Sequence, residues 1–311
     1  MLDLRHLYVL RAIAKEGSLA GAARSLHYSQ PTVTHHLATL EGHFGARLVE
    51  RGPRGATLTD VGRTLLPHAD AVVRRLGRAE DEIRTLLGGA ETVLRVGAFP
   101  TASALLLPRA VRQIAEQGVT FDLTEGELPA LLDLLRRDEL HVALVFTQPD
   151  DPLTLDDGIT LHPVLDDPLD LVLPPEHPCA SLDRVPLKAL REEPWIVGTT
   201  AWDPCDRQLD RACEEAGYRP LTALRSDDYG VIQGHVAAGS GVALVPRLAL
   251  NSPRADIVVR PVEGPRLARR ISAATVGPPR RRGAHDLVAA VRTQADRISA
   301  DWRATSSPCG A

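Results

Sequence analysis

The sequence predicts a mixed α+β protein, and its 311 residues are enough for more than one domain. Three observations support this prediction. Near the N-terminus, two short helical patterns follow each other with almost no loop between them. An apolar stripe then repeats with seven-residue spacing along one long helix. From residue 91 onward, strand patterns alternate with helix patterns, which is typical of an α/β domain.

The first expected element is a helix over residues 2–15, with Gly17 as a left-handed terminator. Two short helices follow, and Ser18 and Ser29 are suitable N-caps for them. Pro31 falls in the first turn of the second short helix, where its missing N–H costs little. Two helices joined by a very short turn are typical of a helix-turn-helix.

The second short helix shows which side it buries. Its apolar residues are spaced four, three and four apart and form one narrow stripe: Val33, Leu37, Leu40 and Phe44. The opposite side carries small or hydrogen-bonding residues and no acid before Glu41. Such a face can enter the major groove of DNA without repulsion from the phosphates. The alternative is an ordinary solvated helix pair.

A hairpin is expected after this helix. Residues 48–50 and 57–59 can pair as short strands around a turn whose tip presents Arg51 and Arg54. Either arginine could reach a phosphate or the minor groove. The pattern therefore favours a wing beside the helix-turn-helix over a solvated loop.

A long helix is expected from Thr59 or Asp60 to about residue 87. Its apolar positions have the spacing of three coiled-coil heptads: Leu65, Ala69, Val72, Leu76, Ala79, Ile83 and Leu86. Charged residues fill most other positions, so we expect this seam to pack against the same helix of a second chain. Packing within its own chain is the alternative. Gly88 and Gly89 end the helix.

The next part of the chain reads as an α/β domain with a largely parallel sheet. The expected strands are 93–97, 119–123, 142–146, 169–173, 195–197, 223–225, 242–245, 257–262 and 271–276. The expected helices are 104–115, 128–137, 206–216, 229–238 and 284–303.

Composition and charge argue against a membrane protein, a secreted protein and a structural zinc site. No apolar run approaches the roughly 18 residues of a membrane span, and residues 2–14 are too charged for a signal peptide, so we expect a cytoplasmic protein. The cysteines contain no Cys-x-x-Cys pair, which argues against structural zinc: Cys179, Cys205, Cys213 and Cys309. The net charge is −4, but residues 1–60 carry +2, which leaves −6 for the remainder and places positive charge with the helix-turn-helix.

A stretch of about sixty residues carries a more specific pattern. Its residues are Ala22-Ala23, Leu26, Ser29-Gln30-Pro31, Val33-Thr34, Leu37, Leu40-Glu41, Phe44-Gly45, Leu48-Val49-Glu50-Arg51 and Leu58-Thr59-Asp60-Val61-Gly62. This pattern resembles the DNA-binding segment of LysR-type transcriptional regulators, and the rest of the chain resembles that family more loosely.

The resemblance implies which residues meet DNA. In the family, the positions matching Gln30, Pro31 and Thr34 do so. The candidate DNA-binding residues are Ser29, Gln30, Pro31, Thr32, Thr34, His35, Arg51 and Arg54. One departure concerns His35, because the family usually has Arg there, the best bidentate partner for guanine. This difference bears on the base preference and not on DNA binding itself.

The resemblance also implies the domain organisation. Its parts are a winged helix-turn-helix domain over 1–60 (motif 18–37), a linker and dimerisation helix over 61–88, and an effector-binding domain over 91–305. The last is built like a periplasmic solute-binding protein, with lobe I near 91–162 and 264–305 and lobe II near 163–263. The crossings between the lobes are expected near 161–166 and 260–265.

Ligands of such sheets bind beyond the carboxyl ends of strands, where helix N-termini point. The loops at these places are rich in hydroxyl and aromatic residues, which gives the effector candidates Phe99, Thr101, Ser103, Thr147, Thr199, Thr200 and Trp202. Family positions that often contact effectors match Thr101, Ser103 and Thr200. The natural guess is a small organic acid or a polar aromatic, although Asp203, Asp227 and Asp228 complicate a purely anionic ligand. Alternatively, the hydroxyls only cap helices.

We therefore expect a dimeric or tetrameric regulator that binds an imperfect inverted repeat in promoter DNA and responds to a small molecule. RNA polymerase is a further partner that this function allows. No nucleophile–base pair or metal cluster supports an enzyme, and no cofactor or metal is expected. A small-molecule binding protein or enzyme without DNA function is one alternative.

A regulator that senses oxidants through Cys205 and Cys213 is the other alternative. Eight residues apart on one intact helix, the two cysteines would lie about 12 Å apart. A disulfide requires Cα atoms within about 7 Å, so forming one would require the helix to unfold.

Overall fold

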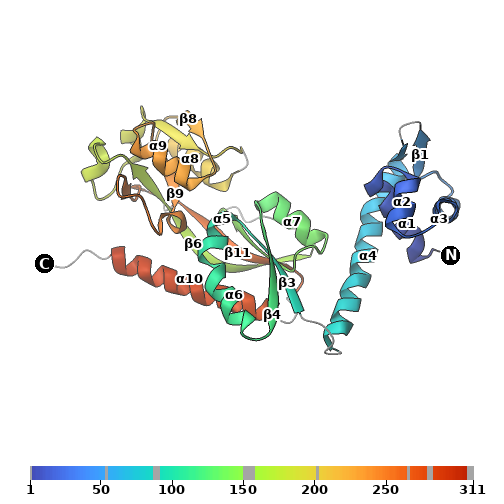
Figure 1. Ribbon diagram of the computed structural model, residues 1–311. Coiled ribbons are helices and arrows are strands. Elements are labelled where there is room, and N and C mark those ends of the chain that lie inside the picture. Colours follow the sequence, from blue (N-terminus) through green and yellow to red (C-terminus); the bar gives the residue numbers. More distant parts are fainter. Residues whose placement is uncertain are drawn as a thin grey trace. The chain divides into compact units, whose positions relative to one another are not determined.

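The computed structural model describes residues 2–52, 55–86, 92–149, 158–200, 203–264, 267–278 and 283–306. The chain divides into two compact units, Met1–Ala90 and Glu91–Ala311, and each is described by itself. Figure 1 labels their elements. The mixed α+β class expected from the sequence is confirmed. Within the described ranges, none of the helices has the length and apolar character needed to cross a membrane.

The first unit is mainly helical and contains one hairpin. Its elements are α1 (Leu4–Glu16), α2 (Leu19–Ser25), α3 (Gln30–Phe44), β1 (Val49–Gly52), β2 (Gly55–Leu58) and α4 (Asp60–Leu86). α1 starts two residues later than expected because the Asp3 side chain caps it, accepting from the Arg5 N–H. It ends at Gly17, whose φ of 65° confirms the expected left-handed terminator.

The helix-turn-helix is formed by α2 and α3 as predicted. The side chains of Ser18 and Ser29 accept backbone N–H bonds at the two helix starts, which confirms both N-caps. In the turn between the helices, His27 takes a positive φ of 54°. Ala22 and Ala23 on α2 are buried, and their small side chains let α2 approach its neighbours closely.

The apolar stripe of α3 is buried except at its last residue. Val33, Leu37 and Leu40 pack into the core of the first unit. Phe44, which was expected to share that core, is 44% exposed. It occupies the final position of α3, and its ring packs edge-on against His43 with centroids 5.0 Å apart. The buried stripe therefore ends one turn earlier than the spacing predicts.

The hairpin confirms a wing but changes the position of one arginine. β1 and β2 pair antiparallel, from Val49 opposite Leu58 to Gly52 opposite Gly55. Arg51 lies within β1 and not at the tip, because the strand extends two residues beyond the expected 48–50. Arg54 lies outside the described residues.

The first part of the apolar seam of α4 packs within its own unit, although we expected it to pack against a second chain. Ala69 is only 1% exposed, and Leu65 packs against the same core. The reason is that α4 packs against α1, where Arg11 and Asp70 form an ion pair. Farther along the helix, Val72 and Ile83 are 47% and 56% exposed. Leu76 is half-buried and Ala79 is exposed, while the side chain of Leu86 and the residues Gly88 and Gly89 lie outside what the structure describes.

The second unit alternates strands and helices. Its strands are β3 (Thr92–Ala98), β4 (Val119–Glu125), β5 (Val142–Thr147), β6 (Ile159–Leu173), β7 (Pro194–Val197), β8 (Leu221–Arg225), β9 (Ala243–Pro246), β10 (Val258–Arg260) and β11 (Ala268–Val276). Its α-helices are α5 (Pro100–Leu105), α6 (Leu107–Ala115), α7 (Leu128–Arg136), α8 (Pro204–Glu215), α9 (Tyr229–Ala237) and α10 (Ala284–Ser306). Short 3-10 helices are η1 (Pro178–Ser181), η2 (Leu187–Leu190) and η3 (Arg247–Leu250).

The main sheet is mixed, whereas the sequence predicted a largely parallel one. Its strand order is β10-β6-β11-β5-β3-β4, with β9 also paired to β6. β3 runs parallel to β4 and β5, but β6 and β11 run antiparallel to their partners. The cause is the 15-residue strand β6, which continues through the expected crossing, and β11, which returns directly beside it. The return therefore falls at β11, just beyond the expected 260–265.

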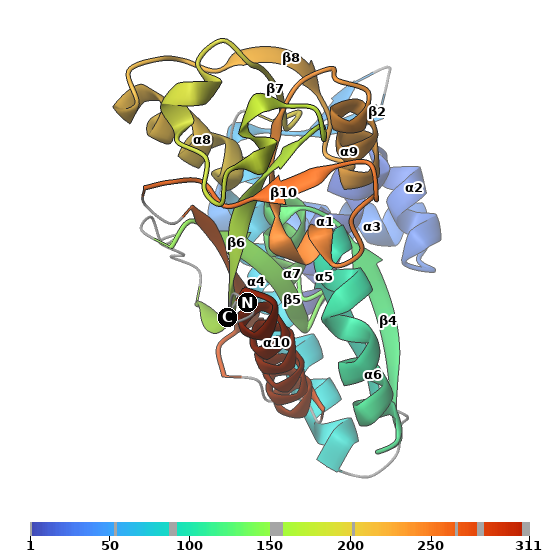
Figure 2. The same ribbon diagram turned by 90° about the vertical axis from the view of Figure 1, so that its left-hand side faces the viewer.

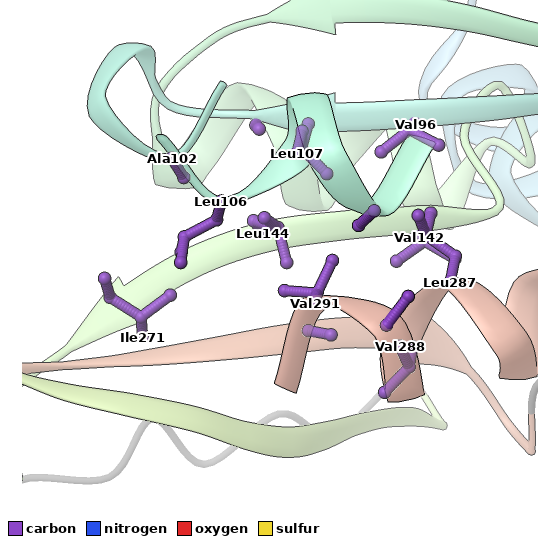
Figure 3. Packing of buried hydrophobic residues seen from close by; sticks show 14 of the residues in the cluster. Val96, Ala102, Leu106, Leu107, Val142, Leu144, Ile271, Leu287, Val288 and Val291 are labelled. Atoms are coloured by element: carbon purple, nitrogen blue, oxygen red, sulfur yellow. The ribbon is translucent and has the colours of Figure 1, made fainter. Parts of the chain in front are cut away.

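These two strands join two groups of elements, which Figure 1 shows at either end of β6 and β11. One group holds β3–β5, α5–α7 and α10, and the other holds β7–β10, α8 and α9. In Figure 2, α6 and α10 lie side by side, in agreement with their direct packing. Seen from close by in Figure 3, their apolar residues meet alternate residues of the sheet, including Val142 and Leu144. Ala143 and Val145 point to the other face, where α7 packs.

Candidate functional site

A shallow groove lies on the exposed side of α3, opposite its buried stripe. It is lined by Gln30, Pro31, Thr34, His35 and Ala38. These positions recur at helical spacing, so their side chains share one face of the helix. Four of the sequence candidates therefore come together in one surface feature.

Two other candidate residues use their hydroxyl groups to stabilise the start of α3. The hydroxyls of Ser29 and Thr32 share a hydrogen bond of 2.7 Å, and the Thr32 N–H donates to the Ser29 hydroxyl. These two residues hold the first turn of the helix in place. The polar side chains that line the groove are therefore Gln30, Thr34 and His35.

The acid of α3 is turned away from this groove. The Glu41 carboxylate accepts hydrogen bonds from the backbone N–H groups of Leu48 (2.8 Å) and Val49 (3.3 Å). It therefore fixes the start of the hairpin. Arg47 and Arg51, just before and within β1, are both exposed. Arg47 is not among the residues predicted from the sequence, although its place immediately before the wing is a usable signal.

The second unit contains a cavity of about 460 Å³ between its two groups of elements. One wall comes from α5, α7 and β5, and the other comes from β7, α8 and α9. The lining residues are Phe99, Pro100, Thr101, Glu127, Phe146, Ile196, Val197, Gly198, Thr200, Asp203, Cys205, Asp206, Ser226, Asp227, Asp228, Tyr229, Ile232, Leu244 and Arg269. This size and this mixture of apolar and polar side chains are typical of small-molecule sites.

The structure places three of the seven effector candidates in this cavity: Phe99, Thr101 and Thr200. Three others are outside the lining. The Ser103 hydroxyl points back toward the Ala98 carbonyl, 3.5 Å away, and Thr147 is buried at the end of β5. The Thr199 hydroxyl and N–H both donate to Asp227. Trp202 lies outside the described residues.

The cavity floor centres on Arg269, which the sequence analysis did not select. This side chain is 1% exposed, and its Nε donates to the Asp167 carboxylate at 2.9 Å. Its Nη2 donates to the Thr101 hydroxyl at 2.9 Å. The guanidinium carbon lies 4.9 Å from the ring centroids of both Phe99 and Phe146. Arg269 is thus held by charge, a hydrogen bond and two aromatic rings.

Asp167 carries this link onward. Its other carboxylate oxygen accepts from the Leu248 N–H at 2.9 Å, at the start of η3. Asp167 stands on β6, opposite Arg269 in the antiparallel register. One buried pair therefore connects α5, β6, β11 and η3 at the base of the cavity. Only the register of β6 against β11 reveals the pairing, since the two residues are 102 positions apart.

The polar part of the lining is rich in carboxylates. Asp203 and Asp228 cap the starts of α8 and α9. Asp206 accepts from the Gly198 N–H at 2.8 Å, and Asp227 accepts from Thr199. Burial, and then the neighbouring Asp203, raise the pKa of Asp206 to about 7. Burial and Asp203 likewise raise the pKa of Glu127 to about 7, although this residue is exposed at the surface of the second unit.

The two cysteines considered for redox sensing lie at opposite ends of α8. Cys205 is in the first turn and lines the cavity, whereas Cys213 is fully buried near the helix end. Neither forms a disulfide. Burial raises the pKa of both thiols, well above the usual range for Cys205, which favours the protonated form over the reactive thiolate. The helix between them is intact.

Comparison with known proteins identifies both units. Residues 4–63 match the family model described as bacterial regulatory helix-turn-helix protein, lysR family, and residues 87–296 match the LysR substrate binding domain. A probable hydrogen peroxide-inducible genes activator of Mycobacterium avium is 35% identical, covering 84% of this chain and 83% of that protein. The small neutral protease regulatory protein of Streptomyces coelicolor is 34% identical, covering 89% and 87%.

A solved structure of a LysR-type regulator has the same fold. Full-length OxyR of Pseudomonas aeruginosa, in a variant with one cysteine replaced by aspartate, matches with a TM-score of 0.67 and 25% identity, covering 94% of this chain and 95% of that one. The helix-turn-helix model and the substrate-binding model together span nearly the whole chain. The chain therefore belongs to the LysR family of bacterial transcriptional regulators.

Proposed function

We propose that the first unit reads promoter DNA with the exposed side of α3 and that the cavity of the second unit binds the small molecule that controls this reading. The observation that carries the proposal is the groove over Gln30, Thr34 and His35, from which the acid of α3 is turned away. A helix presenting such a face, next to a hairpin with exposed arginine, suits the major groove with a backbone contact beside it.

Each side chain has a distinct part in this proposal. Gln30 can make a bidentate contact to adenine, and Thr34 can contact a base edge or a thymine methyl group. His35 is shorter than arginine, so it contacts fewer acceptors of guanine. Ser29, Pro31 and Thr32 fix the helix start close to the phosphates. Arg51 and Arg54 contact the backbone or the minor groove.

We also propose the domain limits and the mode of assembly. The DNA-binding domain is 1–60, the linker helix is 61–88 and the effector domain is 91–305, with lobe II at about 163–263. The outer part of the α4 seam, from Val72 to Leu86, pairs with the same helix of a second chain, since Val72 and Ile83 are exposed and apolar. A homodimer, or a homotetramer built from it, then presents two reading heads to an imperfect inverted repeat.

The effector acts through the two walls of the cavity. Phe99, Thr101 and Thr200 come from opposite walls, so a ligand between them favours one relative arrangement of those walls. Arg269 and Asp167 transmit that arrangement because they connect the cavity floor to β6, β11 and η3.

The name of the Mycobacterium avium relative raises peroxide sensing as a second function. The two cysteines of α8 give peroxide sensing little support. Cys205 and Cys213 are held by one intact helix, eight residues apart, and the pKa of each is raised by burial. Small-molecule binding in the cavity is the better-supported input.

The proposal is tested by fluorescence anisotropy with the full chain and its own upstream intergenic DNA, at two salt concentrations. Gln30→Ala should lower the affinity for the preferred site by about 5- to 150-fold, the equivalent of about 1–3 kcal/mol for one bidentate contact, and leave binding to random duplex unchanged. Arg51→Ala should weaken all sequences alike and reduce the salt slope by about one.

The control is Gln117→Ala, which changes the same residue type at an exposed position of the second unit. It should bind as the wild type does. Equal loss for specific and random DNA on Gln30→Ala would exclude Gln30 from base reading. Wild-type binding that does not respond to salt would count against the DNA interface as a whole.

A further inference from the structure

The walls of the effector cavity carry an excess of negative charge. Five carboxylates belong to the lining: Glu127, Asp203, Asp206, Asp227 and Asp228. Among the lining residues, the cationic side chain is Arg269, and it is already paired with the buried Asp167. Arg269 and the nearby Arg225 of β8 offset part of this charge, since they lower the pKa of Glu127 and of Asp206 respectively. The carboxylates still outnumber these cations, so an anionic ligand would be disfavoured and a cation would be attracted.

Two of the helix starts that face the cavity, those of α8 and α9, already hold carboxylates of the chain itself. Asp203 accepts from the backbone N–H groups of Cys205 and Asp206 at the start of α8. Asp228 accepts from Gly230 and Val231 at the start of α9. In other proteins such N–H groups hold phosphates or carboxylates of ligands. Here the chain's own carboxylates occupy them.

Glu127 differs from these capping residues. Its carboxylate makes no hydrogen bond or ion pair with any side chain or backbone group in the described ranges, although it belongs to the cavity lining. Burial raises its pKa, Asp203 and Asp227 add to this effect, and Arg269 opposes it. A positively charged group in the cavity would relieve this repulsion and give Glu127 a partner.

The rest of the lining limits the kind of cation. In the described part of the chain, no group of three or more His, Cys, Asp or Glu side chains is placed to hold a metal ion. The remaining wall is apolar and includes Ile196, Ile232 and Leu244. A cavity of about 460 Å³ with charge at one side and an apolar wall at the other suits a charged head on a compact apolar body.

We propose that the effector of this regulator is an organic cation, a primary amine carried on a compact apolar or aromatic group, with Glu127 as its principal partner. The inference rests on the proposed function, because it names the ligand class of the same cavity. The evidence for a ligand site is the cavity within a substrate-binding domain, and the carboxylates indicate which ligand the site selects.

The binding should release protons. Glu127 and Asp206, each with a pKa of about 7, hold a proton part of the time at neutral pH. An alkylammonium group stays charged over the same range, since its pKa is about 10. The cation binds the ionised carboxylates, so its affinity should rise about tenfold from pH 6 to pH 8 if one such ionisation is required.

The test is calorimetric titration of the full chain with two probes of similar shape, 2-phenylethylamine and 3-phenylpropanoate, at pH 6 and pH 8. The amine should bind at least tenfold more tightly than the acid, and more tightly at pH 8. Glu127→Gln should weaken amine binding at least fivefold at pH 8 and reduce the pH dependence. Glu125→Gln is the matched control, because Glu125 is exposed on β4 and outside the lining.

Three results would overturn the proposal: binding of the acid as tight as that of the amine, no binding of either probe at millimolar concentration, or amine binding that Glu127→Gln leaves unchanged. Titration of the same preparations with DNA separates this failure from failure of the proposed function. Specific, salt-sensitive DNA binding alongside any of these results leaves the regulator function standing and removes only the cationic ligand. Loss of both would remove the function as well.

Discussion

Asp206 makes the stability of the second unit depend on pH. Burial and Asp203 raise its pKa to about 7 in the folded protein, while in the unfolded chain it is near 3.9. The folded state therefore holds the proton more tightly, and stability from this group is fully present below about pH 4 and is lost as pH rises to about 7. We expect Asp206→Asn, which keeps an acceptor for the Gly198 N–H, to raise the thermal midpoint more at pH 8 than at pH 5.

The measurement is differential scanning calorimetry of the ligand-free protein at both pH values. Asp296→Asn, at an exposed position of α10, is the control and should leave the midpoint unchanged. A gain that is equal at the two pH values, or larger at pH 5, would show that the Asp206 carboxyl titrates in its ordinary range.

The cysteines give a second prediction for single residues. Because Cys205 and Cys213 are protonated and separated along an intact α8, a modest excess of hydrogen peroxide should leave both thiols unmodified. Mass spectrometry after treatment and alkylation reads the thiols, and anisotropy reads DNA binding. Rapid formation of a Cys205–Cys213 disulfide with altered DNA binding would establish the redox function instead.

For single residues, the sequence predicts a role well when that role depends on neighbours in the chain. It predicts a role poorly when that role depends on a partner from a distant strand. Phe99, Thr101 and Thr200 follow strand ends directly, and the structure places them in the cavity. Arg269 gives no such signal, because it is one of two adjacent arginines at the start of β11 and its role depends on the register that sets it opposite Asp167. Ser103 was selected on the same local grounds as Thr101 but points back to its own backbone.

Two glycines of α4 allow a matched test of how this helix packs. A Cβ at Gly62 would lie 2.2 Å from the Leu48 carbonyl oxygen, whereas a Cβ at Gly77 would meet nothing within 4 Å. Gly62→Ala should destabilise the first unit by about 1–3 kcal/mol through overpacking. Gly77→Ala should stabilise the helix by about 0.5–1 kcal/mol, because alanine loses less backbone freedom. Hydrogen exchange of α1 and α4 amides measures both changes, and equal effects of the two substitutions would contradict the close approach of α4 to Leu48.

The outer part of α4 gives a prediction about assembly. Ile83 is 56% exposed on the apolar seam. Ile83→Glu should raise the dimer dissociation constant at least tenfold, because the substitution places a charge in the proposed helix–helix contact. Light scattering after size exclusion at micromolar concentration measures the mass. Ala71→Glu, at an exposed position outside the seam, should keep the wild-type mass, and an unchanged mass for Ile83→Glu would exclude this seam as the interface.

The sequence predicts a helix or strand well where a single hydrophobic periodicity determines its type and length. It predicts less well where tertiary packing divides or extends the element. The expected helix over 104–115 is divided at Leu106 into α5 and α6, and a Pro stands at each start. The apolar seam of α4 looks uniform in sequence, yet Leu65 and Ala69 pack on α1, which only the tertiary structure shows. β6 is longer than its apolar run because its first half, which is mostly partly exposed, also pairs with β11.

For the whole molecule, the two units differ in charge as their proposed partners differ. Residues 1–90 carry a net charge of +3 and residues 91–311 carry −7. The positive unit exposes one side of α3 and the wing residue Arg51, which we propose to meet DNA, and the negative unit holds a cavity lined by carboxylates. A LysR-type regulator with this division should bind DNA less tightly as salt rises, while its cavity selects a ligand of the opposite charge.

We propose that the chain reads a specific DNA sequence as a dimer through α3. Selection of bound duplexes from a random pool by the full chain, followed by sequencing, tests this claim without assuming any target site. The bound pool should be enriched in an imperfect inverted repeat whose preferred bases change with Gln30→Ala and persist with Gln117→Ala. A bound pool that shows no sequence preference, or the same preference after Gln30→Ala, would contradict it.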